Sequence, residues 1–404
     1  MQELTLSIMA TSLDPAEEIR PVLAEFEAEQ HIHVNLQVIS WETAWVELVK
    51  MALYRHGPDV SEVGSTWTVN LTSMDALRPF TKAESDSFGG AAAFVPTLWN
   101  SEVPASSQQR WGIPWNVHTD VICYRRDLLA RAGLDAARAF DTSDHMAMTL
   151  THLQQNGYDL PLIMPTTDQS IRDNLHLMAS WVWGHGGDFI SPDGKRTLFQ
   201  QAEARAGIKA YFNLYRYLPP RVHNLDINAA CAEFTRGRAV SVILPAILLY
   251  RLFRLQPKNL APEVQANFGT AVLPGTPFVG GSNLVIWKHA PSGKTPAILK
   301  LIHFLTGRRA QVLFGQRSGI PPARLNALDD PFFAAEPFQS VAKSLQTGRS
   351  YRSLERWGIV EEKLVAALSQ IRSEVLAHPN DDLDTIISRQ LDPVAQNLDL
   401  ILGS

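Results

Sequence analysis

The strongest constraint on the fold is the alternation of strand-like and helix-like segments near the start of the chain. Residues 4–8, 32–38 and 58–64 read as strands, the first two with alternating apolar and polar side chains. Residues 14–26 and 41–52 lie between them and place apolar side chains on one helical face. Strands that alternate with helices form βαβ units, so we expect a mostly parallel sheet flanked by helices.

The first of these helices carries both a start signal and a disturbance. Asp14 followed by Pro15, with Glu17 in the first turn, is typical of a helix N-terminus. Pro21 lies inside the same apolar pattern and lacks the N–H that a helix interior needs. We therefore expect this helix to begin late or to kink at Pro21.

Length and composition indicate more than one folding unit and exclude several classes of protein. A chain of 404 residues is longer than the roughly 250–300 residues that one core supports, so two lobes are expected. The formal net charge of −5 and the absence of a Lys/Arg cluster argue against a nucleic-acid partner. The longest apolar stretch, residues 239–250, is shorter than the roughly 18 residues of a membrane span and contains Pro245.

Two features bear on the cellular compartment and leave alternatives open. The chain opens on a strand pattern and not on a signal peptide, so it is either cytosolic or the mature form of an exported protein. Cys123 and Cys231 are too few for a disulfide scaffold. We expect two buried free thiols, with a single bridge as the alternative in an oxidising compartment.

Motifs for catalysis and metal binding fail when their spacing is tested. Gly293-Lys294-Thr295 resembles the end of a phosphate-binding loop, but Lys288 occupies the position where that loop needs its first glycine. Residues 184–187 lack the spacing of a dinucleotide fingerprint. No metalloprotease or Gly-x-Ser-x-Gly pattern occurs, so we predict no catalytic residue, no metal and no cofactor.

Tryptophans at the junctions of loops and helices are the most informative side chains. Residues 181–189 read WVWGHGGDF, which is either core packing at a helix end or a flat apolar wall for a ligand. Trp181 and Trp183 are two positions apart and cannot share one helical face, so we expect Trp183 to face a ligand. Indole rings stack on the apolar faces of sugars, and polar side chains bind the ring hydroxyls.

Five stretches of the sequence together resemble a known family. In order they are residues 25–45, 57–80, 111–134, 181–199 and 280–328. They resemble the extracytoplasmic solute-binding proteins of ABC importers, in the carbohydrate-binding group related to maltose-binding protein. The chain departs from the pattern after Pro245, where an aromatic residue of the ligand-facing loop is missing. The identity of a ligand therefore does not transfer from a relative.

The resemblance implies a two-lobed periplasmic-binding-protein-like α/β fold, each lobe a mostly parallel sheet flanked by helices. It places the ligand in a cleft between lobes that close by a hinge motion. The boundaries that it implies are 1–117 plus 269–320 for lobe one, 121–266 plus 321–404 for lobe two, and hinge crossings near 116–120, 267–269 and 319–321.

The candidate ligand-binding residues lie at strand ends, crossings and the Trp-rich segment. For each, a structural role is the alternative: Trp41 as helix-face core, Ser65 and Thr66 as helix caps, Asp120 as a hinge residue. The predicted set is Trp41, Ser65, Thr66, Trp67, Asn116, Asp120, Trp181, Trp183, Gly187, Asp188, Gly281, Ser282, Asn283 and Arg317.

The function that the resemblance implies is non-catalytic binding of a mono- to oligosaccharide and its delivery to the permease subunits of an ABC importer. A monomer is expected, periplasmic or extracellular, free or anchored as a lipoprotein. A phosphorylated or polyol-type solute is the alternative ligand. Two other classes stay open: a ligand-loaded sensor for a membrane signalling receptor, and an enzyme such as a glycosidase or transferase on the same fold.

Overall fold

Two units, each with its own sheet, make up the chain. The computed structural model describes residues 2–11, 14–101, 109–167 and 171–403. Unit 1 comprises residues 1–118, 279–335 and 350–358, and unit 2 comprises residues 119–278, 336–349 and 359–404. The chain therefore passes from one unit to the other five times.

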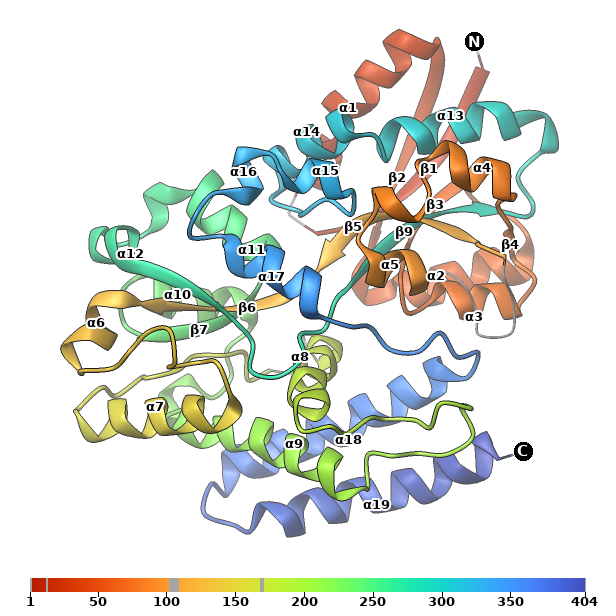
Figure 1. The fold of residues 1–404 in the computed structure, drawn as a ribbon. Helices are drawn as coiled ribbons and strands as arrows, with labels where there is room; N and C mark the ends of the chain where they lie inside the picture. Colours follow the sequence, from red (N-terminus) through yellow and green to blue (C-terminus); the bar gives the residue numbers. More distant parts are fainter. Residues whose placement is uncertain (1, 12–13, 102–108, 168–170, 404) are drawn as a thin grey trace. The chain divides into compact units, whose positions relative to one another are not determined.

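The sheet of unit 1 has six strands (Figure 1). Their order is β2-β1-β3-β9-β4, with β5 pairing beside β9. Strands β2 and β3 run parallel to β1, whereas β3, β4 and β5 are each antiparallel to β9. The bounds are β1 Gln2–Ala10, β2 Ile32–Ser40, β3 Val60–Gly64, β4 Leu77–Arg78, β5 Gly112–His118 and β9 Gly280–Trp287.

The α/β class is confirmed, but the prediction of mostly parallel sheets is not. The parallel part of unit 1 is the segment with βαβ alternation, as expected. Strand β9 returns to the sheet after more than 160 residues and joins it antiparallel. In unit 2 the three strands pair antiparallel in the order β7-β6-β8, with bounds β6 Asp120–Arg125, β7 Ser241–Pro245 and β8 Phe268–Val272.

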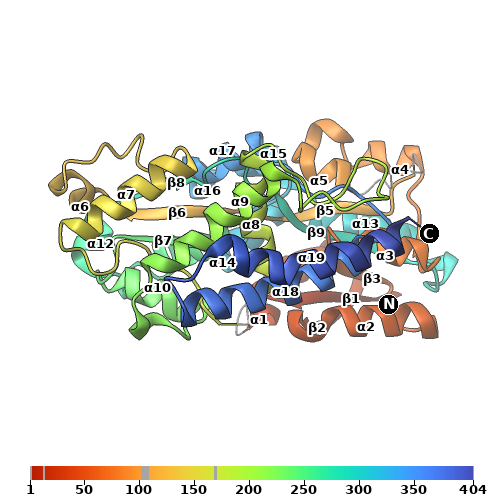
Figure 2. The same ribbon diagram turned by 90° about the horizontal axis from the view of Figure 1, so that it is seen from below.

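Helices supply most of the remaining structure in both units (Figures 1 and 2). Those of unit 1 are α1 Pro15–Gln30, α2 Trp41–Tyr54, α3 Thr68–Ser73, α4 Lys82–Ser87, α5 Pro96–Ser101, α13 Thr295–Leu305, α14 Arg308–Ser318, α15 Leu325–Leu328 and α16 Pro331–Ala334. Those of unit 2 are α6 Arg126–Arg131, α7 Ser143–Gln155, α8 Ile171–Gly184, α9 Ala202–Asn213, α10 Ile227–Thr235, α11 Ala246–Tyr250, α12 Pro262–Asn267, α17 Gln339–Thr347, α18 Trp357–Ala377, which begins in unit 1, and α19 Leu383–Leu402.

Helix α1 begins at Pro15, directly after Asp14, and runs through Pro21, so the expected late start is wrong. The Asp14 carboxylate accepts a hydrogen bond from the Glu17 N–H, which satisfies one free donor of the first turn. Pro21 cannot donate to the Glu17 carbonyl, four residues earlier. Arg317 on α14 donates to the Glu17 and Glu18 carbonyls instead, at 3.4 and 3.2 Å. The helix therefore continues past the proline, with hydrogen bonds to its carbonyls supplied by a side chain of α14.

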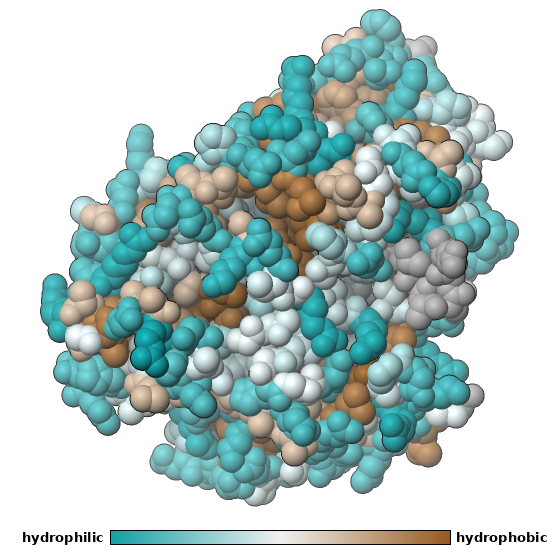
Figure 3. Space-filling model, viewed as in Figure 1, coloured by the Kyte–Doolittle hydropathy of each residue, from teal (hydrophilic) through white to brown (hydrophobic). Residues whose placement is uncertain are grey.

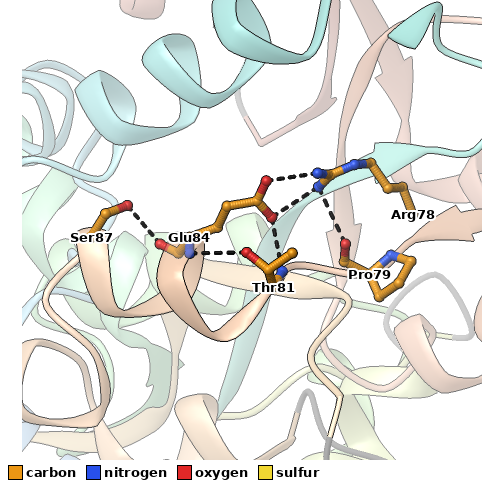
Figure 4. A network of polar contacts seen from close by, with 5 residues as sticks. All are labelled: Arg78, Pro79, Thr81, Glu84 and Ser87. Atoms are coloured by element: carbon orange, nitrogen blue, oxygen red, sulfur yellow. Dashed lines mark hydrogen bonds and ion pairs between the residues drawn. The ribbon is translucent and has the colours of Figure 1, made fainter.

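Polar caps define other short elements of unit 1. The hydroxyl of Thr81 accepts from the Glu84 N–H, and the Glu84 carboxylate accepts from the Thr81 N–H, which together form a capping box at α4 (Figure 4). Arg78 binds both oxygens of the same carboxylate, at 2.6 and 3.1 Å. This bidentate pair ties the end of β4 to the start of α4.

Two local features of the structure differ from what the sequence predicts. The apolar pattern over residues 294–314 predicts one helix, but Gly307 is extended (φ −71°, ψ 153°) and separates α13 from α14. The predicted boundary at 319–321 also differs, because residues 321–335 stay with unit 1. The Pro321 carbonyl accepts from the Val117 N–H, and the Ala323 N–H donates to the Trp115 carbonyl.

Helices α18 and α19 lie side by side in both views (Figures 1 and 2). The Glu374 carboxylate on α18 accepts hydrogen bonds from Arg389 and Gln390 on α19. Arg205 and Lys209 on α9 form ion pairs with Asp392 and Asp384 on α19. The C-terminal helix is thus joined to the body of unit 2 by polar contacts on two sides.

Both cysteines are free and buried, as the sequence predicts. Burial raises the pKa of Cys123 and raises the pKa of Cys231 to about 12. Among the described helices, none combines the length and apolar character of a membrane span. Hydrophilic side chains cover most of the face shown in Figure 3, with apolar patches between them.

Candidate functional site

The carboxyl end of β3 gathers polar side chains around one buried carboxylate. Glu62 is 3 % exposed and accepts three hydrogen bonds, each from a different strand. The donors are the Met9 N–H on β1 at 2.7 Å, the Ser282 hydroxyl on β9 at 2.6 Å and the Asn116 amide on β5 at 3.2 Å. Asn116 and Ser282 also face each other across the β5–β9 pair.

The environment of Glu62 raises its pKa, because burial removes the charged form from water. The three donors oppose this shift and favour the carboxylate. The sequence prediction missed Glu62, although a charged residue within the short strand segment VSEVG was a usable signal.

The turn after β3 lines a small pocket. The Ser65 N–H donates to the Gly281 carbonyl at 2.9 Å, which holds the turn against β9. Ser65 and Thr66 line this pocket, and the rings of Tyr351 and Trp357 stack beside it with centroids 4.1 Å apart. Its other lining residues are Val69, Ser101, Ser350, Arg352, Ser353 and Leu354. The sequence did not single out the stacked pair, which lies almost 300 residues from Ser65.

The two predicted indoles of unit 1 differ in accessibility. Trp67 is 7 % exposed and belongs to the apolar core with Val63, Leu71 and Val285. Trp41, the first residue of α2, is 37 % exposed and contacts the Trp67 ring with centroids 5.5 Å apart. Trp41 is therefore the more accessible stacking surface, and Trp67 mainly supports it.

Three further predicted residues of unit 1 lie on β9. Gly281 has a φ of +148°, and a Cβ there would lie 2.0 Å from the Asn116 carbonyl oxygen, so no larger residue fits. Asn283 is fully buried, with its amide 3.5 Å from the Thr68 hydroxyl. Ser282 lies between them and is bound to Glu62.

Arg317 lies apart from this group. Its guanidinium is exposed on α14, and its bonds to the Glu17 and Glu18 carbonyls give it a structural role at Pro21. That role accounts for the arginine without a ligand.

In unit 2 the two tryptophans of the WVWGHGGDF segment have different surroundings. Trp181 is 1 % exposed and packs against Tyr211 with centroids 5.4 Å apart, so it is a core residue and not a ligand wall. Trp183 is 6 % exposed, and its indole N–H donates to Asp188 at 3.2 Å. Both indoles are buried, each against different neighbours, and a ligand contact at Trp183 stays a prediction.

Asp188 is the centre of a small polar and aromatic cluster. Its second oxygen accepts from Arg349 at 2.9 Å, and the Arg349 guanidinium lies 4.5 Å from the centre of the Trp183 ring. Phe278 stacks against both Trp183 and His176. The sequence missed Arg349 and Phe278, because their contacts to this segment join positions about 90 to 160 residues apart.

The glycines of this segment have packing roles. Gly186 adopts a left-handed φ of +81° in the turn after α8. A Cβ at Gly187 would lie 2.5 Å from the Ala204 Cα, so this glycine permits close contact with α9.

Asp120 begins β6 opposite Pro245 and is 7 % exposed. Of the predicted residues of unit 2, Trp183 and Asp188 are brought together by a direct bond.

The comparisons with known proteins establish the family. The model of the bacterial extracellular solute-binding protein family matches residues 22–338, so the chain belongs to this family. Membership implies a periplasmic or extracellular location. A search of curated proteins gave no match.

Solved structures share the fold at low sequence identity. The sugar-binding protein MalE of Xanthomonas citri is 22% identical, with a TM-score of 0.82 over 100% of this chain and 98% of that one. A solute-binding protein of Thermotoga lettingae bound to α-D-tagatose is 19% identical, with a TM-score of 0.79 over all of both chains. One from Agrobacterium radiobacter bound to ribitol is 16% identical, with a TM-score of 0.77 over 100% and 98%. The α/β fold is therefore that of MalE-like solute-binding proteins.

The chemistry of the described residues fits solute binding. Hydroxyl and amide groups at the end of β3 can exchange hydrogen bonds with a polar solute, and Trp41 offers an apolar face beside them. Among the described residues, no group of three or more His, Cys, Asp or Glu side chains is arranged to hold a metal ion.

Proposed function

We propose that the chain binds a carbohydrate or polyol without chemical change and delivers it to the permease of an ABC importer. The observation that carries the proposal is the end of β3, where Ser65 and Thr66 line a small pocket together with the stacked Tyr351 and Trp357. Hydroxyls next to flat apolar rings suit a molecule with polar edges and apolar faces. Relatives bound to tagatose and to ribitol support this choice of ligand class.

The residues that we propose to bind the ligand fall into two sets. The unit 1 set is Trp41, Ser65, Thr66, Asn116, Gly281 and Ser282, with Trp67 and Asn283 as supporting residues. The unit 2 set is Trp183 and Asp188, with Arg349 and Phe278 beside them, and Asp120 at the start of β6. Each set is testable by its own variants.

The remaining parts of the proposal concern the assembly. The protein acts as a monomer, free or anchored as a lipoprotein, and its partners are the permease subunits. Light scattering after size-exclusion chromatography measures whether the protein is a monomer. Reconstitution of the importer in vesicles tests the permease partnership, because uptake of a labelled sugar should then depend on this chain.

A ligand screen tests the central claim. Purified protein is mixed with D-tagatose, maltose, ribitol and D-glucose 6-phosphate, and unfolding is followed by tryptophan fluorescence, with calorimetry to measure affinity. A ligand at 100 times its Kd adds about 2.7 kcal/mol to the free energy of unfolding. Stabilisation by a neutral probe, recovered unchanged afterwards, supports the proposal. Turnover of the probe, or no response to any neutral sugar or polyol in a wider panel, overturns it.

A further inference from the structure

Glu62 fixes the hydrogen-bonding polarity of its neighbours. An ionised carboxylate can only accept hydrogen bonds, and the Met9 N–H can only donate. The Ser282 hydroxyl hydrogen is committed to Glu62, and so is one hydrogen of the Asn116 amide. Toward another molecule, Ser282 and Asn116 can therefore mainly accept hydrogen bonds, through the serine lone pairs and the Asn116 Oδ1.

We propose that Glu62 is the positioning residue of the unit 1 ligand set, and that it makes Asn116 and Ser282 acceptors for the hydroxyl groups of an uncharged ligand. This inference rests on the proposed function. It adds that the site selects a neutral polyhydroxy ligand over a phosphorylated one.

In its ionised form, which the three donors favour, Glu62 discriminates against anions. A ligand that bonds to Ser282 or Asn116 lies about two hydrogen bonds, roughly 5–6 Å, from the carboxylate. Glu62 is buried, and within the described part of the chain no Lys, Arg or His is among the groups that bond to it. Repulsion between two negative charges at that distance is weakly screened in a buried environment. A neutral hydroxyl compound meets no such repulsion.

Two substitutions separate length from charge. Glu62→Gln keeps the length and removes the charge. Its amide oxygen can replace Oε1, which accepts from both Ser282 and Asn116, while its N–H₂ group replaces Oε2, which accepts from the Met9 N–H. Ser282 and Asn116 therefore keep their orientation, and the bond that is lost is the one from Met9. Glu62→Asp keeps the charge but withdraws it by one methylene from both partners.

Ser61 offers a matched control on the same strand. It is fully buried, and its hydroxyl bonds to Ser7 at 2.6 Å and to the Trp287 indole at 2.7 Å. Adjacent residues of a strand point to opposite faces of the sheet, so Ser61→Ala removes buried hydrogen bonds on the other face. It therefore reproduces a loss of stability without a change at Asn116 or Ser282.

Calorimetric titration with D-tagatose, maltose, ribitol and D-glucose 6-phosphate tests the inference. We expect wild-type protein to prefer a neutral probe. We expect Glu62→Asp to bind that probe about tenfold or more weakly, Glu62→Gln to lose less affinity for it, and Ser61→Ala to match wild type within about twofold. Only Glu62→Gln should reduce the ratio of the Kd for D-glucose 6-phosphate to the Kd for the neutral probe.

Other outcomes are distinguishable. Unchanged affinity in Glu62→Asp overturns the positioning role while the proposed function stands, and so does tight binding of the sugar phosphate by wild type. No binding of any neutral probe by wild type overturns both. A ligand-free readout covers variants that fold poorly: in wild-type protein the Asn116 side-chain N–H₂ signals, identified by their loss in Asn116→Asp, should exchange slowly with solvent. Fast exchange would show that Glu62 does not hold the Asn116 amide in place, which overturns the positioning role.

Discussion

Glu62 makes the stability of unit 1 depend on pH at the scale of one residue. Burial raises its pKa above the ordinary value of 4.5, so the folded state binds the proton more tightly than the unfolded state does. The contribution of Glu62 to the free energy of unfolding therefore falls as pH rises from about 4.5 through the folded pKa. Urea unfolding between about pH 4 and pH 8 should show wild type losing stability relative to Glu62→Gln with rising pH. Parallel profiles would contradict the assignment.

The three indoles Trp41, Trp181 and Trp183 illustrate how a residue type is ambiguous until its surroundings are known. Trp181→Ala removes a 1 % exposed ring and should lower the free energy of unfolding by about 3–5 kcal/mol. Trp41→Ala removes a 37 % exposed ring and should cost much less stability, about 1 kcal/mol, while weakening binding of the neutral probe. Chemical denaturation and calorimetry on both variants measure the contrast. Equal losses of the free energy of unfolding in the two variants would show that Trp41 is a core residue.

At the scale of elements, Pro21 and Arg317 form a testable pair. Arg317→Ala leaves the Glu17 carbonyl without its donor and should cost about 0.5–1.5 kcal/mol. Pro21→Ala restores the helical N–H, so the arginine should matter less in that background. A double-mutant cycle by urea unfolding measures the coupling. Probe affinity should stay unchanged in Arg317→Ala. Weaker binding at unchanged stability would instead place Arg317 in the ligand set.

The elements themselves were largely predictable, because strand alternation, helix faces and the cap at Asp14 are local patterns. What failed depended on distant partners. The antiparallel return of β9 and the break at Gly307 follow from packing that the local pattern does not contain. Likewise the Glu62–Ser282 bond spans 220 positions and the Asp188–Arg349 bond spans 161. Of the candidate site, the strand-end residues were predictable by rule, whereas Glu62, Arg349 and the Tyr351–Trp357 stack depend on contacts between distant parts of the chain.

For the whole molecule, five passages of the chain between units mean that neither unit is a contiguous segment. Unit 2 needs α19, whose buried face includes Leu383, Ile386 and Leu391 and whose acidic residues pair with α9. The segment 119–278 lacks these contacts, so we expect it not to fold cooperatively when expressed alone. Amide NMR dispersion and urea unfolding of the segment and of the full chain measure this. A sharp, native-like transition in the segment would show that its own three-stranded sheet and helices suffice, and that the C-terminal helices only add stability to a domain already formed.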